Sequence, residues 1–304
     1  MLKVNQVTTA IISIIIASLF WGTTGTAASF TPDVSPLAVG AFSMGFGGVL
    51  LLLSGYKNVC REYKAIQAKS SYLVIGGLAI AIYPLAFYMS MKYSGVAIGT
   101  VISIASAPLF SVLLERLINH KPIKLQWTVS FIIGVIGVFF IASGKHASTT
   151  LEISSNTQYL GILLGLLAGL TYATYSWAAK QMITNNISSQ SAVASMFGLA
   201  ATLLLPSLYF TADNLFANYN NTLVALYMAV IPMFFGYLLF GYGLRHLDVS
   251  TATLITLIEP VIATLLAIVI VGETFSLIGW VGMFFIAICL VLQMLKVPPK
   301  VNKA

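Results

Sequence analysis

One acidic residue lies at the centre of a long apolar segment. Glu259 is the only Asp, Glu, Lys or Arg between positions 249 and 271. If that segment lies in lipid, a charged side chain at its centre costs about 2.5–3.5 kcal/mol, so the carboxylate is expected to face the protein interior. There it could exchange a proton or pair with an ammonium group. Alternatively, it hydrogen-bonds backbone groups left free by Pro260, which has no N–H to donate to Thr256.

Aromatic residues with small or hydroxyl-bearing neighbours form a second group of candidates. They recur at helical spacing, so each set shares one face of a helix. Aromatic faces attract cations and apolar groups, and Tyr and Thr hydroxyls can fix the orientation of a bound molecule. Ordinary packing and a belt at the lipid–water interface are the alternatives. The candidates for lining a central cavity are Trp21, Thr24, Tyr83, Tyr172, Tyr175 and Tyr237.

The composition identifies the solvent around these candidates. Of the 304 residues, 59% are hydrophobic and 8% are charged, against about 25% charged in ordinary globular proteins. These charges are too few to cover a water-soluble globule, so much of the surface must face lipid. The composition therefore excludes a disordered chain, and it argues against a nucleic-acid binder despite the net charge of +7.

Enzyme and metal chemistry have no recognisable machinery in the sequence. There is no phosphate-binding loop ending in Lys–Ser/Thr, no His–Glu–x–x–His and no Gly–x–Ser–x–Gly. His120, His146 and His246 do not share metal-ligand spacing. Cys60 and Cys289 form neither a metal cluster nor a disulfide framework. We therefore expect no enzymatic activity, no cofactor and no bound metal.

Ten apolar runs have the length of about 20 residues that a helix needs to cross a bilayer. Charged residues, Asn and Pro separate them, and the longest gap, Tyr56–Ser71, has 16 residues and leaves no room for a soluble domain. The sequence therefore predicts an all-α integral membrane protein with ten transmembrane helices. The predicted spans are Thr8–Phe30, Pro36–Gly55, Tyr72–Met91, Gly95–Ile118, Leu125–Gly144, Tyr159–Gln181, Gln190–Phe210, Thr222–Leu244, Val249–Val271 and Ser276–Leu295.

The distribution of Lys and Arg predicts the orientation. With the N-terminus in the cytoplasm, 13 of the 15 Lys and Arg residues fall on the cytoplasmic side, and only Lys92 and Lys145 fall outside. Positive residues accumulate in cytoplasmic loops. We therefore expect a multi-pass protein of the cell (inner) membrane, surrounded by membrane lipid, with both termini in the cytoplasm. Glu115, beside Arg116 near an inner span end, is expected to be a paired interfacial charge.

The two halves of the chain resemble each other. A shift of 151 residues aligns Ala17–Ala28 with Ala168–Ala179, which divides the chain into halves of residues 1–150 and 151–304. Each half holds five spans, an odd number, so the second half must cross the membrane in the opposite sense. The sequence thus predicts two inverted five-helix repeats. A solute site between such halves, near mid-membrane, is typical of secondary transporters.

Two prolines occupy matching positions in the two halves. A shift of 152 places Pro108 on Pro260, and both lie inside predicted spans. Breaks in equivalent helices let unwound backbone line a cavity. We therefore expect a helix break or hinge at each proline, with a simple tolerated bend as the alternative.

Motifs in the first, sixth and ninth spans carry a resemblance to a known family. They are LFWGTTG (Leu19–Gly25), LTYATYSWAAK (Leu170–Lys180) and Ser250–Phe275, where Glu–Pro and the later Gly–Glu are the most specific elements. With these motifs the whole chain resembles the drug/metabolite transporter superfamily, in particular its ten-helix members with two EamA-type repeats. The first half departs from the pattern, since Ala107–Pro108 replaces Glu–Pro and Asn119–His120 replaces Gly–Glu.

The resemblance implies a transporter, because relatives move amino acids, amines, nucleosides, sugars, cationic drugs or other metabolites. It also implies roles in gating for Lys180 and Glu273. The alternatives are a snorkelling membrane anchor for Lys180 and a solvated acid for Glu273.

Together these observations predict a secondary transporter that moves a small organic metabolite, such as an amino acid or amine, by alternating access. Export is the expected direction because relatives are often exporters. Proton coupling through Glu259 and uncoupled, channel-like facilitation both remain open. An intramembrane enzyme would need two or more polar catalytic groups at one depth, and a scaffold would bind without moving a solute. A monomer and a homodimer are both compatible with the sequence.

Overall fold

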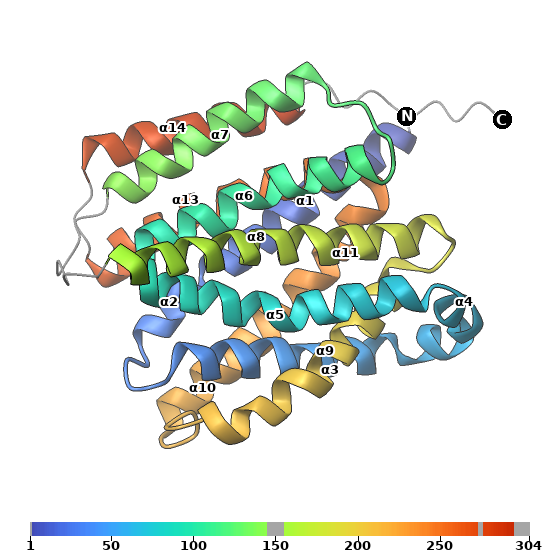
Figure 1. Cartoon of the computed structure of the whole chain (residues 1–304), viewed down its shortest axis with the longest axis horizontal. Helices are drawn as coiled ribbons and strands as arrows, with labels where there is room; N and C mark the ends of the chain where they lie inside the picture. Colours follow the sequence, from blue (N-terminus) through green and yellow to red (C-terminus); the bar gives the residue numbers. More distant parts are fainter. Residues whose placement is uncertain (1, 145–154, 273–275, 295–304) are drawn as a thin grey trace.

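The described part of the chain is helical. The computed structural model describes residues 2–144, 155–272 and 276–294, and these residues contain no β-strand. Within them, nine helical segments are long and apolar enough to cross a membrane, and a shorter apolar helix covers Leu277–Gln293. The predicted all-α fold with ten crossing segments is confirmed (Figure 1).

The first five crossings contain two short helices besides the long ones. Pro36 begins the second crossing, where its missing N–H would have no helical acceptor. Gly95, with φ of +86°, separates the third crossing from the fourth, and glycine adopts this conformation without strain. The elements are α1 (Leu2–Gly22), α2 (Thr24–Ser29), α3 (Pro36–Arg61), α4 (Tyr63–Ala68), α5 (Ser70–Ser94), α6 (Val96–Leu117) and α7 (Leu125–Gly144).

The second five crossings are less regular than the first five. The eighth changes to a π-helix in its middle, and the ninth passes through a 3-10 turn and a π-helical end. The elements are α8 (Ser155–Thr184), α9 (Ser189–Thr211), α10 (Tyr219–Met228), η1 (Ala229–Phe235), α11 (Gly236–His246), α12 (Val249–Ile255), η2 (Thr256–Ile258), α13 (Glu259–Leu266), η3 (Ala267–Val271) and α14 (Leu277–Met294).

The prolines do not all act as predicted. No helix break is present at Pro108, because α6 runs through it as one helix, which agrees with the alternative of a tolerated bend; a hinge role there stays a prediction. A transmembrane helix can keep its course past a proline when neighbouring groups satisfy the freed backbone. The break at Pro260 is present, since the 3-10 turn η2 ends directly before Glu259 and Pro260. A further distortion, the π-helix η1 around Pro232, was not predicted from the sequence.

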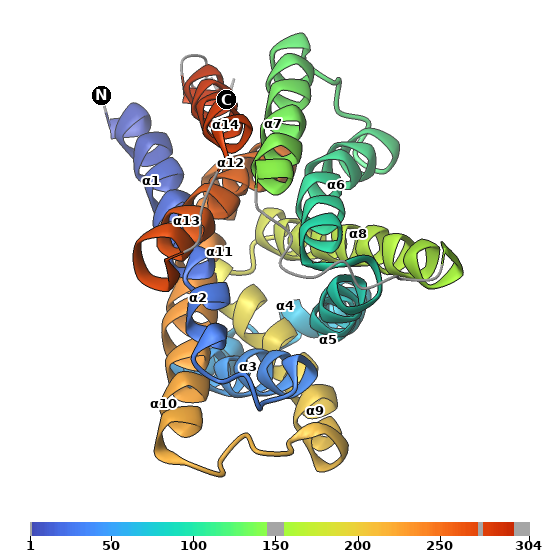
Figure 2. The same ribbon diagram turned by 90° about the vertical axis from the view of Figure 1, so that its left-hand side faces the viewer.

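Each long helix of the first half packs on a helix of the second. α3 lies against α9, α7 against α14, α5 against α8, and α1 against α11 (Figures 1 and 2). Glycines permit the closest approaches. A Cβ added at Gly48 of α3 would lie 2.5 Å from the carbonyl oxygen of Phe197 in α9, and one at Gly161 of α8 would lie 2.5 Å from the backbone nitrogen of Ser94 in α5.

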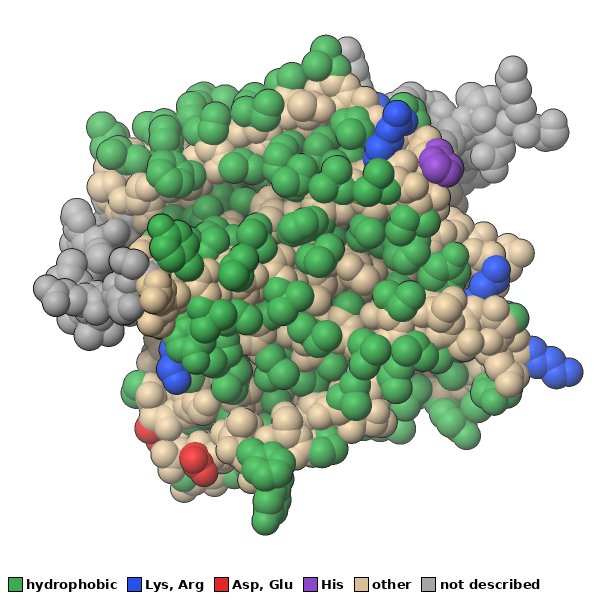
Figure 3. Space-filling model, in the orientation of Figure 1, with side chains coloured by type: hydrophobic (Ala, Val, Ile, Leu, Met, Phe, Trp, Pro, Cys, Tyr) green, Lys and Arg blue, Asp and Glu red, His purple; other side chains and the backbone are tan. Residues whose placement is uncertain are grey.

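The two ends of the bundle can be named from its helices. α1 begins and α14 ends at one end, which we call the terminal end, while α8 begins at the opposite end (Figure 1). Hydrophobic side chains cover the face shown in Figure 3, and the few charged side chains on that face lie towards the two ends. This distribution is the one expected of a surface in contact with lipid.

The contact between Gly48 and Phe197 predicts a loss of stability on substitution. Gly48→Ala should lower the free energy of unfolding by about 1–3 kcal/mol, because the new methyl group meets backbone that cannot move aside cheaply. Gly25→Ala is the matched control, since no atom lies within 4 Å of its added Cβ. Thermal unfolding of the purified variants in detergent checks this. Equal unfolding midpoints for the two variants would contradict the proposed packing.

Candidate functional site

A cavity with a volume of about 660 Å³ opens towards the opposite end of the bundle. Its walls come from α1 and α2, the connection 30–35, α3, α5, α6 and α13. Figure 2 shows these elements from the end at which the cavity opens. Lys92, at the C-terminal end of α5, lies near its mouth, and Glu259 and Pro260 belong to its wall.

A smaller cavity continues the large one into the centre of the bundle. Its volume is about 50 Å³, which is enough for water but not for an organic molecule. The two cavities share Trp21, Thr24, Phe87, Tyr88 and Glu259 in their linings. The small one adds the predicted residues Tyr83, Tyr172, Tyr175 and Tyr237. The structure therefore brings all six predicted aromatic and hydroxyl candidates together around Glu259.

Glu259 contributes the acidic group of this site. It is the first residue of α13, and its side chain is half-buried and lines both cavities. Its carboxylate makes no hydrogen bond or ion pair with any residue that the structure describes. The alternative expected from the sequence, a hydrogen bond to backbone groups freed by Pro260, is therefore not seen. A carboxylate in this position is available to a solute or to water.

Trp21 is fixed by a hydrogen bond to the distorted eighth crossing. Its indole Nε1–H donates to the carbonyl oxygen of Pro232 at 2.9 Å. A backbone carbonyl has two lone pairs, so that of Pro232 can accept this bond from outside its own helix. Gly236 provides the space, because a Cβ there would lie 2.7 Å from Nε1 of Trp21. The ring of Trp21 also packs on that of Tyr237, with centroids 5.0 Å apart.

The tyrosines close the inner end of the cavity. The rings of Tyr172 and Tyr175 are stacked with centroids 5.2 Å apart, and the ring of Tyr83 lies 5.7 Å from that of Tyr172. The hydroxyl groups of Tyr175 and Tyr237 are 3.0 Å apart, and the hydroxyl of Tyr172 donates to Oγ1 of Thr256 at 3.2 Å. Phe197 packs directly against Tyr237, with centroids 4.3 Å apart. This aromatic layer separates the cavity from the terminal end.

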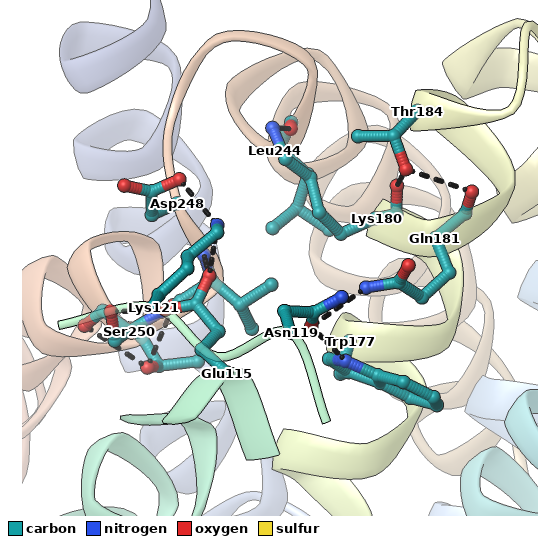
Figure 4. A network of polar contacts seen from close by, with 12 residues as sticks. Glu115, Asn119, Lys121, Trp177, Lys180, Gln181, Thr184, Leu244, Asp248 and Ser250 are labelled. Carbon is teal, nitrogen blue, oxygen red and sulfur yellow. Dashed lines mark hydrogen bonds and ion pairs between the residues drawn. The ribbon is translucent and has the colours of Figure 1, made fainter. Parts of the chain in front are cut away.

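The predicted gate residues have different outcomes. Lys180 lies beyond the aromatic layer, where its ammonium group donates to the carbonyl oxygen of Leu244 at 2.6 Å (Figure 4). Its side chain is buried, so the alternative of a snorkelling anchor is wrong. Glu273 lies outside the described residues. Neither gating role is tested by these positions.

A cluster of charged side chains near Lys180 was not predicted from the sequence. Nζ of Lys121 lies 2.9 Å from Oε1 of Glu115 and 2.7 Å from Oδ1 of Asp248 (Figure 4). The paired charge expected at Glu115 is confirmed, with Lys121 as its partner, but the side chain is buried and not exposed at the interface. Partial burial lowers the pKa of Lys121, but the hydrogen bond to Asp248 and the charges of Glu115 and Asp248 outweigh it, so the pKa is raised overall. Lys121 therefore stays protonated at neutral pH.

The arrangement offers binding rather than covalent chemistry. Among residues 2–144, 155–272 and 276–294, no group of three His, Cys, Asp or Glu side chains could hold a metal ion. The cavity instead combines one free carboxylate, several aromatic faces and an opening at one end of a lipid-embedded bundle. These are the features of a transporter for small molecules.

Comparison with known proteins agrees with this class and identifies the family. Residues 8–143 and 159–295 each match the EamA-like transporter family, so the chain belongs to it and carries two EamA repeats. The family resemblance predicted from the sequence motifs is confirmed. The chain is a membrane transporter and not an enzyme.

Individual relatives are similar along most of the chain. The uncharacterized transporter YwfM of Bacillus subtilis (strain 168) is 29% identical over 270 residues, which is 88% of each protein. The aromatic amino acid exporter YddG of Salmonella typhimurium (strain 14028s / SGSC 2262) is 22% identical over 90% of this chain and 92% of its own length. A solved crystal structure with 17% identity covers 95% of this chain with a TM-score of 0.79, which shows a shared fold.

The contact of Trp21 with Pro232 and Gly236 can be tested by a double-mutant cycle. Gly236→Ala should destabilise the protein by about 1–3 kcal/mol, because its methyl group displaces the indole. In a Trp21→Phe background the same substitution should cost clearly less, since the clashing Nε1 atom is gone. Thermal unfolding of the four proteins measures this difference. Additive effects of the two substitutions would contradict the contact.

Proposed function

We propose that the protein is a secondary transporter for small organic molecules that carry an ammonium group, such as amines and amino acids. The observation that carries the proposal is the carboxylate of Glu259, which lacks a protein partner among the described residues and lines a cavity of about 660 Å³. A carboxylate surrounded by aromatic faces attracts a cation by both charge and ring quadrupole. The volume falls within the range of about 300–1,000 Å³ typical of sites for small organic ligands.

The relatives support the same class of cargo. YddG of Salmonella typhimurium is named as an exporter of aromatic amino acids. The rings of Trp21, Tyr83 and Phe87 around Glu259 offer apolar contact to a side chain next to the ammonium group. We propose export as the direction on the strength of this relative. Lys92, near the cavity mouth, would attract the carboxylate of an amino acid and repel a simple amine.

The packing of the helices supports inverted repeats. The second and fifth crossings of one half pack on their own counterparts, as α3 on α9 and α7 on α14. The third crossing of the first half, α5, packs on the first crossing of the second half, α8. In the same way α11, from the third crossing of the second half, packs on α1, the first crossing of the first half, so the roles of the two halves are exchanged. Such exchange is what a two-fold axis in the membrane plane produces. Inverted halves can adopt a second state by exchanging their conformations, which would open the terminal end instead.

The orientation follows from the positive-inside rule. The terminal end is predicted to be cytoplasmic, because 13 of the 15 Lys and Arg residues belong to that side. The cavity then opens to the outside, and the aromatic layer and the charge cluster close the cytoplasmic side. We propose that this arrangement is the outward-open state of an alternating-access cycle.

Coupling to protons would use the same carboxylate. A carboxylate that binds the ammonium group of the cargo in one state and a proton in the other would exchange the two across the membrane. An uncoupled facilitator would bind the cargo at Glu259 without this exchange. The two mechanisms predict different pH dependence of transport.

Glu259→Gln tests the proposal directly. Binding of amines and amino acids should weaken about 30-fold or more, because losing one partner of a buried charge pair costs at least about 2 kcal/mol. Asp213→Asn is the matched control, since Asp213 is an exposed acid at the opposite end. A thermal-shift screen of amines, amino acids, nucleosides and lipophilic cations identifies ligands, and counterflow in proteoliposomes measures transport.

The outcomes separate the alternatives. Saturable counterflow that Glu259→Gln abolishes and Asp213→Asn leaves intact supports a carrier, whereas flux without saturation or counterflow indicates a channel-like facilitator. Transport by Glu259→Gln at the wild-type rate with unchanged pH dependence would remove Glu259 from both binding and coupling.

A further inference from the structure

Buried hydroxyl groups line the contact between α6 and the ninth crossing on the terminal side of the aromatic layer. On α12 and η2 they belong to Ser250, Thr253 and Thr256, and on α6 to Ser111. Glu115, with 3% of its surface exposed, follows Ser111 by one turn. We call this contact the α6/α12 seam. It is a strip of buried polar groups between the two crossings.

The seam extends the cavity wall along the same helix faces. On α6, Thr100 and Ile104 line the cavity, and Ser111 and Glu115 continue the same face at spacings of about one or two turns. The ninth crossing shows the same continuity. Ala263, Pro260 and Glu259 line the cavity, and Thr256, Thr253 and Ser250 follow at steps of three or four residues towards the terminal end. The faces of α6 and of the ninth crossing that line the cavity therefore continue towards the terminal end, where they contact each other in the seam.

Hydrogen bonds connect the seam from one end to the other. At the cavity, the hydroxyl of Tyr172 donates to Oγ1 of Thr256. In the middle, Oγ1 of Thr253 lies 3.1 Å from Oγ of Ser111. At the terminal end, the hydroxyl of Ser250 donates to Oε2 of Glu115. These bonds place polar contacts at both ends and in the middle of the seam.

Holding two helices together through buried polar groups costs more free energy than holding them together through apolar side chains. Buried polar groups must give up water and find protein partners, whereas apolar side chains of the same size would seal the contact without that requirement. Each hydroxyl in the seam is satisfied by a neighbouring side chain or carbonyl while the helices touch. The same groups could bind water or a polar solute if the helices separated.

Glu115 already holds an ammonium group in the closed state. Nζ of Lys121 lies 2.9 Å from its Oε1, and the same carboxylate accepts hydrogen bonds from the backbone N–H groups of Val249 and Ser250 (Figure 4). Lys121 is additionally bound to Asp248, in the connection that precedes α12. These contacts join the end of α6 to the start of α12, so separating the two helices requires Lys121 to leave at least one of its two acids.

We propose that the α6/α12 seam is the terminal-side half of the transport path and that Glu115 is a second carboxylate station for ammonium-bearing cargo, closed by Lys121. This inference rests on the proposed function. Cargo released from Glu259 would pass between α6 and α12 after Lys121 withdraws, and its ammonium group would replace that of Lys121 on Glu115. The arrangement gives the path a carboxylate on each side of the aromatic layer.

Cysteine accessibility tests whether the seam opens. In a Cys60→Ser background, Thr253→Cys probes the seam, and Ser130→Cys in α7 is the matched control, since Thr253 and Ser130 are both fully buried hydroxyl residues near the terminal ends of their helices. A membrane-impermeant cationic thiosulfonate is applied to the terminal side of membrane vesicles. Lys121→Met should raise labelling at position 253 at least about tenfold, because removal of the latch favours separation, and Lys121→Arg should not. Labelling at position 130 should stay low throughout.

The result can overturn the seam without touching the proposed function. If position 253 stays unlabelled in Lys121→Met and also in the milder Asp248→Asn, or if position 130 labels equally, the seam is not a path, whatever Glu259→Gln does to transport. Thermal unfolding of each variant confirms that it is folded.

Protection by cargo tests the second station. An amine that counterflow identifies as transported should slow labelling at position 253 in Lys121→Met and should fail to do so once Glu115→Gln is added. The assignment of Glu115 would be overturned if the amine did not change the labelling rate at position 253. It would also be overturned if the amine slowed labelling equally in Lys121→Met with and without Glu115→Gln. If the seam opens but no amine or amino acid is transported, the role of the seam as a cargo path falls together with the proposed function.

Discussion

The structure depends on the requirement that polar groups inside a bilayer find their partners within the protein. Backbone groups meet it by forming helices, and Trp21 meets it by donating to the carbonyl of Pro232. The carboxylate of Glu259 has no such partner among the described residues, and it lies at a cavity wall. A carboxylate is tolerated there only because the cavity admits water or a solute. The unpaired carboxylate and the cavity therefore belong to the same site.

The two ends of the bundle differ in chemistry, although the halves are related in sequence. Glu115, Lys121 and Asp248 hold α6 to α12 at the terminal end. The residue that matches Glu115 at the repeat shift of 152 is Ala267. The repeat therefore has no copy of this carboxylate at the matching position, and the charge cluster joins α6 to α12 at the terminal end alone. The two repeats therefore share their architecture but not this charge cluster.

The sequence predicted the parts of the site whose residue types conflict with their surroundings. Glu259 is an acid in an apolar run, and Trp21 and Tyr172 repeat at matching positions, so both signals are local or periodic. The contact of Lys121 with Asp248 joins residues 127 positions apart. Charges at span ends are expected in any membrane protein, so nothing in the sequence marked these two as partners. Pro232 carried a usable signal, a proline inside an apolar span, but it has no proline at the matching position in the first half.

A structure of the protein with a transported amine bound would test the central claim most directly. The account predicts the ammonium group at hydrogen-bond distance from the carboxylate of Glu259, with aromatic rings of the cavity within about 6 Å of the charge. It would be contradicted by an amine bound elsewhere in the bundle, with Glu259 hydrogen-bonded to backbone in an empty cavity.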